Sequence, residues 1–258
     1  MNLQFDESVA VNYKSNSQKI RVMSEFWFLK NIFCPCCGNI HIDKMKNNSP
    51  VADMRCENCG EIFELKSKKN HIGLKIPDGA YSTMIERITS NINPQLFVMQ
   101  YSPKLLVKNL IFIPKFFFTP DIIEKRKPLS ATARRAGWIG CNILYHKIPE
   151  QGKINIIRDG KETAMTTVLK WYEKTKALQT DNLKLRGWML DILTCINDIK
   201  SEIFTLQDIY KFADYLKSKH ALNNNIEPKI RQQLQFLRDK SFIEFVGRGV
   251  YHKLELFK

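Results

Sequence analysis

Four cysteines near the start of the chain form two Cys-x-x-Cys pairs, Cys34/Cys37 and Cys56/Cys59, with 18 residues between the pairs. This spacing is typical of a structural zinc site with four thiolate ligands. A metal-binding pair of this kind is a tight turn, so the second pair would join two short strands as a hairpin. The sequence therefore predicts that zinc bound by Cys34, Cys37, Cys56 and Cys59 fixes the fold of this region.

Two residues beside the first pair, Cys36 and His41, carry alternative ligand atoms. Either could replace a cysteine of the first pair, although Cys34 and Cys37 match the spacing of the second pair. The N-terminus, MNLQFDESVA, lacks a basic region followed by an apolar run, so we expect a cytoplasmic protein. Seven cysteines in a reducing compartment favour metal binding over disulfides.

Three charged residues around the second pair, Asp53, Glu64 and Lys66, match the pattern of a metal-dependent nuclease. Side chains alternate between the two faces of a strand. Glu64 and Lys66 would therefore share one face, while Phe63 and Leu65 take the buried one. The hairpin would then bring Asp53 beside Glu64 and Lys66.

The chemistry of this trio follows from its residue types, with Pro50 just ahead of the aspartate. The Asp53 and Glu64 carboxylates are suited to a hard cation such as Mg²⁺, which activates water and polarises a phosphoryl oxygen. Lys66 would orient the water and offset charge in the transition state. We therefore predict Asp53, Glu64 and Lys66 as catalytic residues, although an acidic residue followed by Glu-x-Lys is often only a solvated face.

The formal net charge of +14 favours a polyanionic partner, nucleic acid above all, and leaves an anionic membrane surface as the alternative. No stretch approaches the roughly 18 apolar residues of a membrane span. We expect double-stranded DNA as the partner, no insertion in a membrane, and a monomer.

The hydrophobic periodicity predicts a mixed α/β fold, in which helices cover a mixed sheet. A helix is expected over residues 17–30, and a polar basic loop over 67–77. A second helix should begin at Asp78 and end near Pro94. Strands are expected over 95–101, 106–113 and 154–158, the last leading into an Asp159-Gly160 turn, and a third helix over 166–178.

A basic loop over residues 125–140 carries four residues predicted to contact DNA: Arg126, Arg134, Arg135 and Trp138. Arginines of this kind bind phosphates, and an aromatic side chain among them can reach a base. The alternative is an exposed loop with Trp138 packed beneath it.

Residues 183–258 are predicted to form a second domain, separate from a domain of residues 1–182. Three helices, from Trp188 to Ile199, from Thr205 onward and near Pro228, are followed by a hairpin with a basic tip, which indicates a winged helix-turn-helix. Gln and Arg side chains on the third helix suit base edges, and a wing arginine suits the backbone. The predicted DNA contacts are Arg231, Gln232, Gln233 and Arg248; a protein partner is the alternative.

Long stretches of the chain resemble the methyl-directed restriction endonucleases of the PD-(D/E)xK superfamily. The matching stretches are YKSNSQK, CPCCGN, PVAD, FELKSKK, DGAY, KPLSATARRAGWIGCNI, RGWMLDILTCI, KIRQQLQFLRDK and FVGRG. They cover nearly the whole chain, with less likeness over residues 144–182. Cys36 inside the first cysteine pair departs from the simplest ligand pattern.

This resemblance implies a nuclease core with structural zinc and a C-terminal winged helix. It also implies Mg²⁺-dependent cleavage of duplex DNA at GATC sites containing N6-methyladenine, with both domains reading the methylated sequence. Asp53, Glu64 and Lys66 match the catalytic motif of the family. Two alternatives remain: a non-catalytic regulator that binds methylated DNA, and a nuclease with the same chemistry but a different DNA target.

Overall fold

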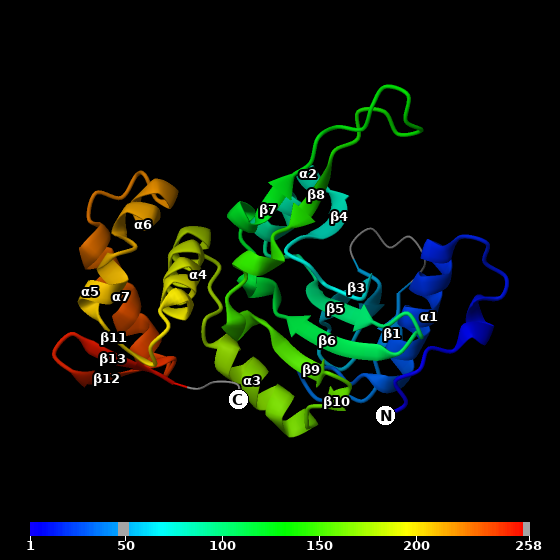
Figure 1. The fold of residues 1–258 in the computed structure, drawn as a ribbon, viewed down its shortest axis with the longest axis horizontal. Coiled ribbons are helices and arrows are strands. Elements are labelled where there is room, and N and C mark those ends of the chain that lie inside the picture. Colours follow the sequence, from blue (N-terminus) through cyan, green and yellow to red (C-terminus); the bar gives the residue numbers. More distant parts are fainter. Residues whose placement is uncertain (46–51, 255–258) are drawn as a thin grey trace.

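The computed structural model describes residues 1–45 and 52–254. Its larger part is built on a seven-stranded mixed sheet in the order β1-β2-β3-β5-β6-β9-β10, seen in Figure 1. Of the neighbouring pairs, β3 and β5 are parallel and the others are antiparallel. The predicted mixed α/β fold is confirmed. The elements are α1 (Asn16–Asn31), β1 (Asp43–Lys44), β2 (Met54–Arg55), β3 (Ile62–Lys69), α2 (Tyr81–Thr89), β5 (Gln95–Tyr101), β6 (Val107–Ile113), β9 (Ile154–Arg158), β10 (Lys161–Glu162) and α3 (Met165–Lys176).

Aromatic side chains on one face of the sheet make the centre of the core. Phe97 on β5 and Phe112 on β6 are partners in register, and Phe63 on β3 packs against both rings. The ring of Phe28 on α1 lies 4.6 Å from that of Phe97, and Tyr172 on α3 lies 5.8 Å from Phe112. Both helices therefore cover this face, and the alternate residues of β3 point away from it.

A second, three-stranded sheet consists of β4 (Ile76–Ala80), β8 (Gly140–Ile143) and β7 (Ile123–Lys125), in that order. Helix α2 packs against all three of its strands. The loop of residues 126–139, which we call the arm, joins β7 to β8 and projects from the body at the top of Figure 1. The small sheet thus joins the arm to the rest of the molecule.

The basic loop predicted over residues 67–77 is shorter in the structure, covering residues 70–75, and the predicted helix start at Asp78 is wrong. Strand β3 continues to Lys69, because β5 pairs with it in parallel from Phe63 to Lys69 and satisfies its backbone groups. Asp78 lies within β4, opposite Cys141 of β8, and α2 begins only at Tyr81. Backbone pairing outweighed the polar composition that suggested a loop.

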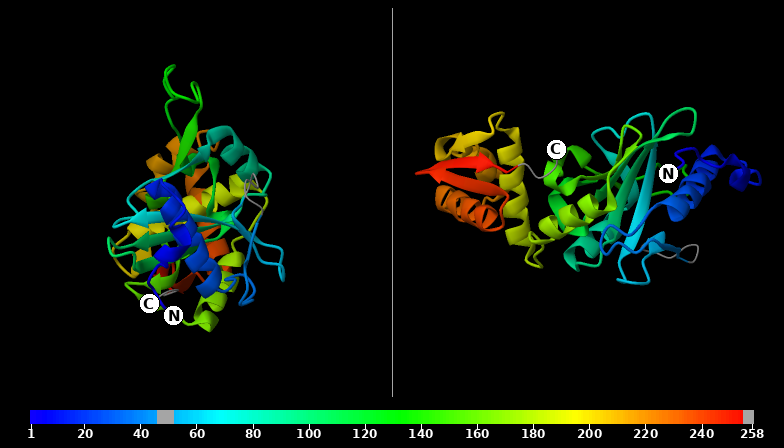
Figure 2. Two further views of the ribbon diagram at one scale, coloured as in Figure 1. Left: turned by 90° about the vertical axis from the view of Figure 1, so that its right-hand side faces the viewer. Right: turned by 90° about the horizontal axis from the view of Figure 1, so that it is seen from below.

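The C-terminal part is a bundle of helices closed by a small sheet in the order β11-β13-β12. The helix expected from Thr205 onward is broken into two: a capping box between Thr205 and Asp208 starts α5, and α6 follows after Phe212. Figure 2 shows this part at one end of the long axis of the molecule and α1 at the other. Its elements are α4 (Leu183–Asp198), β11 (Ile203–Thr205), α5 (Leu206–Tyr210), α6 (Ala213–Lys219), α7 (Ile226–Asp239), β12 (Ile243–Gly247) and β13 (Val250–Lys253).

Polar side chains join the C-terminal part to the sheet. Arg186 on α4 is only 2% exposed, and its guanidinium donates to the carbonyl oxygens of Thr180 and Phe118 and to the side chain of Asn91. Lys219 on α6 contacts Asp121 at 2.6 Å, across the junction. These contacts set how α7 and its hairpin are held relative to the sheet.

In the part of the chain that the structure describes, no helix combines the length and the apolar character needed to span a membrane.

Candidate functional site

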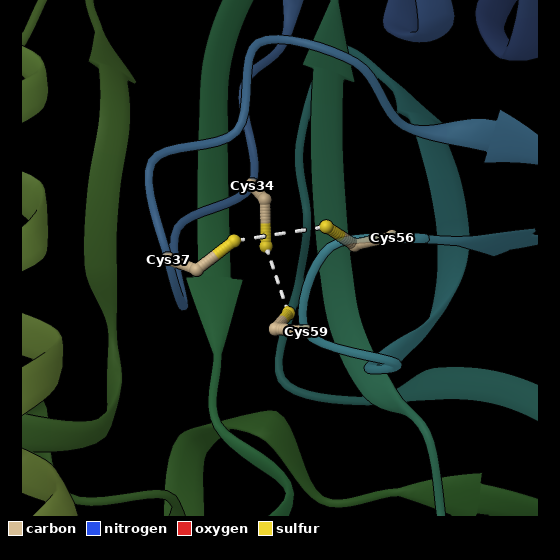
Figure 3. A group of neighbouring side chains, drawn as sticks. All are labelled: Cys34, Cys37, Cys56 and Cys59. Atoms are coloured by element: carbon tan, nitrogen blue, oxygen red, sulfur yellow. Dashed lines mark hydrogen bonds between the residues drawn. The ribbon is translucent and has the colours of Figure 1, made fainter.

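The four cysteines of the two Cys-x-x-Cys pairs converge on one point, as Figure 3 shows. Their sulfur atoms all lie within 4.8 Å of one another. The Sγ atoms of Cys34 and Cys59 are 3.6 Å apart, and those of Cys37 and Cys56 are 3.7 Å apart. A tetrahedron with zinc–sulfur bonds of ~2.3 Å has edges of about 3.8 Å. The four thiols are therefore spaced to hold a tetrahedral metal ion such as zinc.

The residues around the cluster decide which side chains are available as metal ligands. The alternative ligands Cys36 and His41 both lie in the described chain, and neither belongs to the cluster. A hydrogen bond with Cys36 and burial raise the pKa of the Cys34 thiol, and burial raises the pKa of the Cys59 thiol. At Cys56 burial acts in the same direction, but hydrogen bonds from the backbone of Cys59 and the side chain of Asn39 lower the pKa of the thiol to about 7. A thiol that ionises readily is a good metal ligand, since the thiolate is the species that binds.

A second polar cluster lies on the face of β3 that points away from the aromatic core. The Nζ atom of Lys66 is 2.5 Å from Oε1 of Glu64, so the two side chains share one face as their spacing predicts. Asp53 immediately precedes β2, and its Oδ2 accepts a hydrogen bond from the backbone N–H of Leu65 at 3.1 Å. The hairpin therefore brings Asp53 beside the Glu64–Lys66 strand. Pro50 lies outside the described residues.

A third carboxylate, which sequence reasoning missed, completes this acidic cluster. Oδ1 of Asp78 on β4 lies 2.5 Å from Nζ of Lys66. The Pro77-Asp78-Gly79 run favoured a helix start or turn. It therefore drew attention away from the strand pattern, in which Ile76, Asp78 and Ala80 share one face. That alternation is the signal that could have placed Asp78 on the same side of a sheet as its neighbours.

The acidic cluster contains more carboxylates than ammonium groups: Asp53, Glu64 and Asp78 against Lys66. Burial raises the pKa of Glu64 to about 7, with Lys66 opposing the shift and Asp78 and Asp53 adding to it. Burial alone would lower the pKa of Lys66, but Glu64 and Asp78 together raise it. Glu64 and Asp78 both contact the Lys66 ammonium group, and Asp53 lies near enough to Glu64 to raise its pKa further.

The arm carries its basic residues around a tryptophan. Cζ of Arg135 lies 4.7 Å from the centre of the Trp138 ring, close enough for a cation–π contact. The ring also lies close to Gly140, where an added Cβ would be only 2.7 Å from two of its atoms. Trp138 is thus half-buried within the arm, while Arg126, Arg134 and Arg135 are exposed.

The predicted DNA-contacting residues of the C-terminal part are not all accessible. Arg231 and Gln232 are exposed on α7, and Arg248 is exposed in the turn between β12 and β13. Gln233 is only 1% exposed, because it is three residues from Ile230 and next to Leu234 on the core face of the helix. Arg231, Gln232 and Arg248 therefore remain candidates for contact with DNA, whereas Gln233 does not.

The carboxylate–lysine cluster lies on a mixed sheet, and the chain continues into a helical part with exposed polar residues on α7, a combination typical of proteins that act on DNA. The model of the DpnI family, described as the Dam-replacing family, matches residues 1–181. The model of the Dam-replacing HTH domain matches residues 184–253. The chain belongs to the DpnI, or Dam-replacing, family. This membership supports its assignment to the methyl-dependent restriction endonucleases.

Proposed function

We propose that the protein is a type II restriction endonuclease that hydrolyses duplex DNA at GATC sites containing N6-methyladenine, with Mg²⁺ as cofactor. The observation that carries this proposal is the cluster of Asp53, Glu64 and Lys66 on the sheet of a DpnI-family chain. The target sequence and the methyl group come from the family resemblance. The proposal also divides the chain into an endonuclease domain of residues 1–182 and a winged-helix domain of residues 183–258.

The catalytic roles follow from the side chains of the cluster. The carboxylates of Asp53 and Glu64 would hold the divalent cation, because they are adjacent and oxygen is the ligand that Mg²⁺ prefers. A cation bound there supplies Lewis-acid polarisation of the phosphate and a more acidic water. Lys66, kept protonated by its carboxylate neighbours, places a positive charge where the transition state gains negative charge.

The four-cysteine cluster has a structural role in this proposal. Zinc bound by Cys34, Cys37, Cys56 and Cys59 would hold the turn that joins β2 to β3. The same turn separates Asp53 from Glu64 along the chain, so the metal would also fix their relative positions.

A nicking assay separates this proposal from the alternative of a non-catalytic regulator. Supercoiled plasmid methylated at GATC should be linearised with Mg²⁺ and left intact with EDTA. Protein that binds the methylated plasmid but never breaks a phosphodiester bond, at any Mg²⁺ concentration, would be a reader and not a nuclease. Equal cleavage of methylated and unmethylated plasmid would indicate a nuclease with a different target.

Substitutions on α7 and in the wing should separate base reading from backbone binding. Gln232 is exposed on α7, so Gln232→Ala should lose about 1–3 kcal/mol of discrimination against a changed base pair. Arg248→Ala should weaken binding to all duplexes by a similar factor and lower the salt dependence. Affinities for cognate and altered duplexes, measured by anisotropy in Ca²⁺, test both expectations.

Gln179→Ala, at an exposed position between α3 and α4, is the matched glutamine control and should leave both affinities unchanged. Equal weakening of every duplex by Gln232→Ala would contradict a base-reading role for this residue.

Methyl reading requires more than one contact. Burying one methyl group contributes only ~0.8 kcal/mol, or roughly a fourfold gain in affinity. A palindromic GATC site carries two methyl groups, so a single domain reading both gains on the order of tenfold. Two domains that read the site independently would multiply their selectivities without a deeper pocket. We therefore assign one reading to the winged helix and one to the arm.

Trp138 is the apolar contact that we assign to the arm. Trp138→Ala should lower cleavage of methylated DNA and narrow the methylated-to-unmethylated ratio by about fourfold for each methyl group contacted. The measurement is the single-turnover rate on matched duplexes, with zinc content and melting temperature as checks of folding. Trp138→Phe, which keeps an aromatic face, should retain more of the ratio. A folded Trp138→Ala variant with an unchanged ratio would remove Trp138 from methyl reading, and an unfolded one would favour a core role.

A further inference from the structure

Asp78 joins the acidic cluster from β4 of the small sheet and not from the hairpin that carries the other three residues. Its side chain is 4% exposed. Its Oδ1 accepts from Nζ of Lys66 at 2.5 Å and from the backbone N–H of Gly79 at 2.6 Å. The backbone bond fixes the carboxylate in place, so Asp78 offers Lys66 an acceptor whose position does not depend on the hairpin.

The other oxygen of this carboxylate, Oδ2, is buried and has no hydrogen-bond partner. Buried polar atoms are nearly always paired, so an unpaired carboxylate oxygen beside an ammonium group requires a reason. A lysine has three donor hydrogens, and Glu64 engages Lys66 at 2.5 Å. If Glu64 stopped accepting from Lys66, the freed N–H of Lys66 could donate to Oδ2 of Asp78, which has no other partner.

We infer that Asp78 is a positioning residue that retains Lys66 in the active site when Glu64 binds the divalent cation. This inference rests on the proposed nuclease function. A Glu64 carboxylate that also held a cation would share its oxygens between the cation and Lys66, so the contact between Glu64 and Lys66 would be weaker. Asp78 would keep the Lys66 ammonium group in the cluster, with its Oδ2 accepting the Lys66 N–H that no longer donates to Glu64.

The first test is a double-mutant cycle on the cleavage rate. Asp78→Asn should lower the single-turnover rate on methylated duplex by about 10- to 100-fold, as for other partners that orient an active-site group. DNA affinity in Ca²⁺ should not change. In a Lys66→Met background the same substitution should cost less than threefold, because Asp78 acts through Lys66. An equal fold-decrease in cleavage rate on Asp78→Asn substitution in the wild-type and Lys66→Met backgrounds would overturn the inference.

The matched control is Glu124→Gln, which removes a carboxylate paired with Lys75 at 2.6 Å on the same small sheet. It should leave the cleavage rate within twofold of wild type. Zinc content reports whether the fold of each variant is intact. If Asp78→Asn does not fold, Asp78→Glu keeps the charge but moves the carboxylate, and an unchanged rate in that variant would equally contradict a positioning role.

The second test does not depend on cleavage. In metal-free protein, the ¹⁵N-detected ammonium signal of Lys66 should be visible, because hydrogen bonds slow its exchange with water. The signal should disappear in Asp78→Asn and persist in Glu64→Gln. The reverse pattern would make Glu64 the anchor and overturn the inference.

The two tests separate this inference from the proposed function. Wild-type protein that fails to cleave would overturn the function, and the positioning role with it, whatever the spectrum shows. Wild-type cleavage that Asp78→Asn leaves within threefold would overturn the inference alone.

Discussion

Alanine at Asp53, Glu64 or Lys66 is expected to lower DNA cleavage by about 1,000-fold or more while leaving most of the DNA affinity intact. The two carboxylates act on the cation, and Lys66 acts on charge that develops in the transition state. These interactions are much weaker with bound substrate, so their loss affects the rate and not the binding. Single-turnover cleavage and duplex affinity, measured on the same preparations, test this expectation.

Two controls sharpen this result. Glu57→Ala removes a side chain that is 66% exposed in the turn between β2 and β3, and it should cleave at the wild-type rate. Replacing Mg²⁺ by Ca²⁺ in wild-type protein should give binding without turnover, because the larger ion tolerates looser geometry. Near wild-type cleavage by Lys66→Ala would refute the role assigned to that lysine.

Serine at Cys56 or Cys59 should release the metal and reduce both stability and cleavage, the latter by about 100-fold or more. The strand that follows Asp53 is short: β2 pairs with β3 at only two positions, Met54 with Phe63 and Arg55 with Ile62, and with the two-residue strand β1 on its other side. Loss of the metal would therefore let Asp53 move away from Glu64. Zinc content, melting temperature and cleavage rate should fall together.

Cys36→Ser is the matched control for the zinc site. Cys36 lies between two cluster cysteines in the sequence but is not part of the cluster. Its variant should keep about one zinc per chain, with thiolate ligands near ~2.3 Å by X-ray absorption. Loss of zinc from Cys36→Ser, with retention in Cys37→Ser, would reverse the ligand assignment. Full activity in zinc-free wild-type protein would contradict the structural role of the metal.

The sequence predicted the parts of the structure that depend on local spacing. The two Cys-x-x-Cys pairs converge as expected, because each turn fixes its own geometry and the metal requirement fixes their distance. The alternation from Phe63 to Lys66 placed the charged pair and the aromatic core on opposite faces of β3. The strands over 95–101 and 106–113 were predictable because continuous apolar runs of that length are typical of buried strands.

The parts that sequence reasoning missed depend on tertiary pairing. Ser67 to Lys69 look like the start of a solvent-exposed loop, yet the last three residues of β5 pair with them. Asp78 lies on a strand, β4, that pairs with β8, and its carboxylate contacts Lys66. For Gln233, the residue type suggested base reading, whereas its position on the helix placed it in the core. Residue types therefore indicated the chemistry, whereas the accessibility and the neighbours of each side chain depended on the fold.

The central claim is tested most directly by one cleavage panel. Three duplexes that contain a single GATC site, unmethylated, hemimethylated and fully methylated at adenine N6, are incubated with protein and Mg²⁺, and single-turnover rates are measured. The proposed function predicts the fastest cleavage of the fully methylated duplex, slower cleavage of the hemimethylated duplex, and cleavage of the unmethylated duplex at least about 100-fold slower, as two independent tenfold readings imply. Equal rates on all three duplexes, or no cleavage of any, would contradict it.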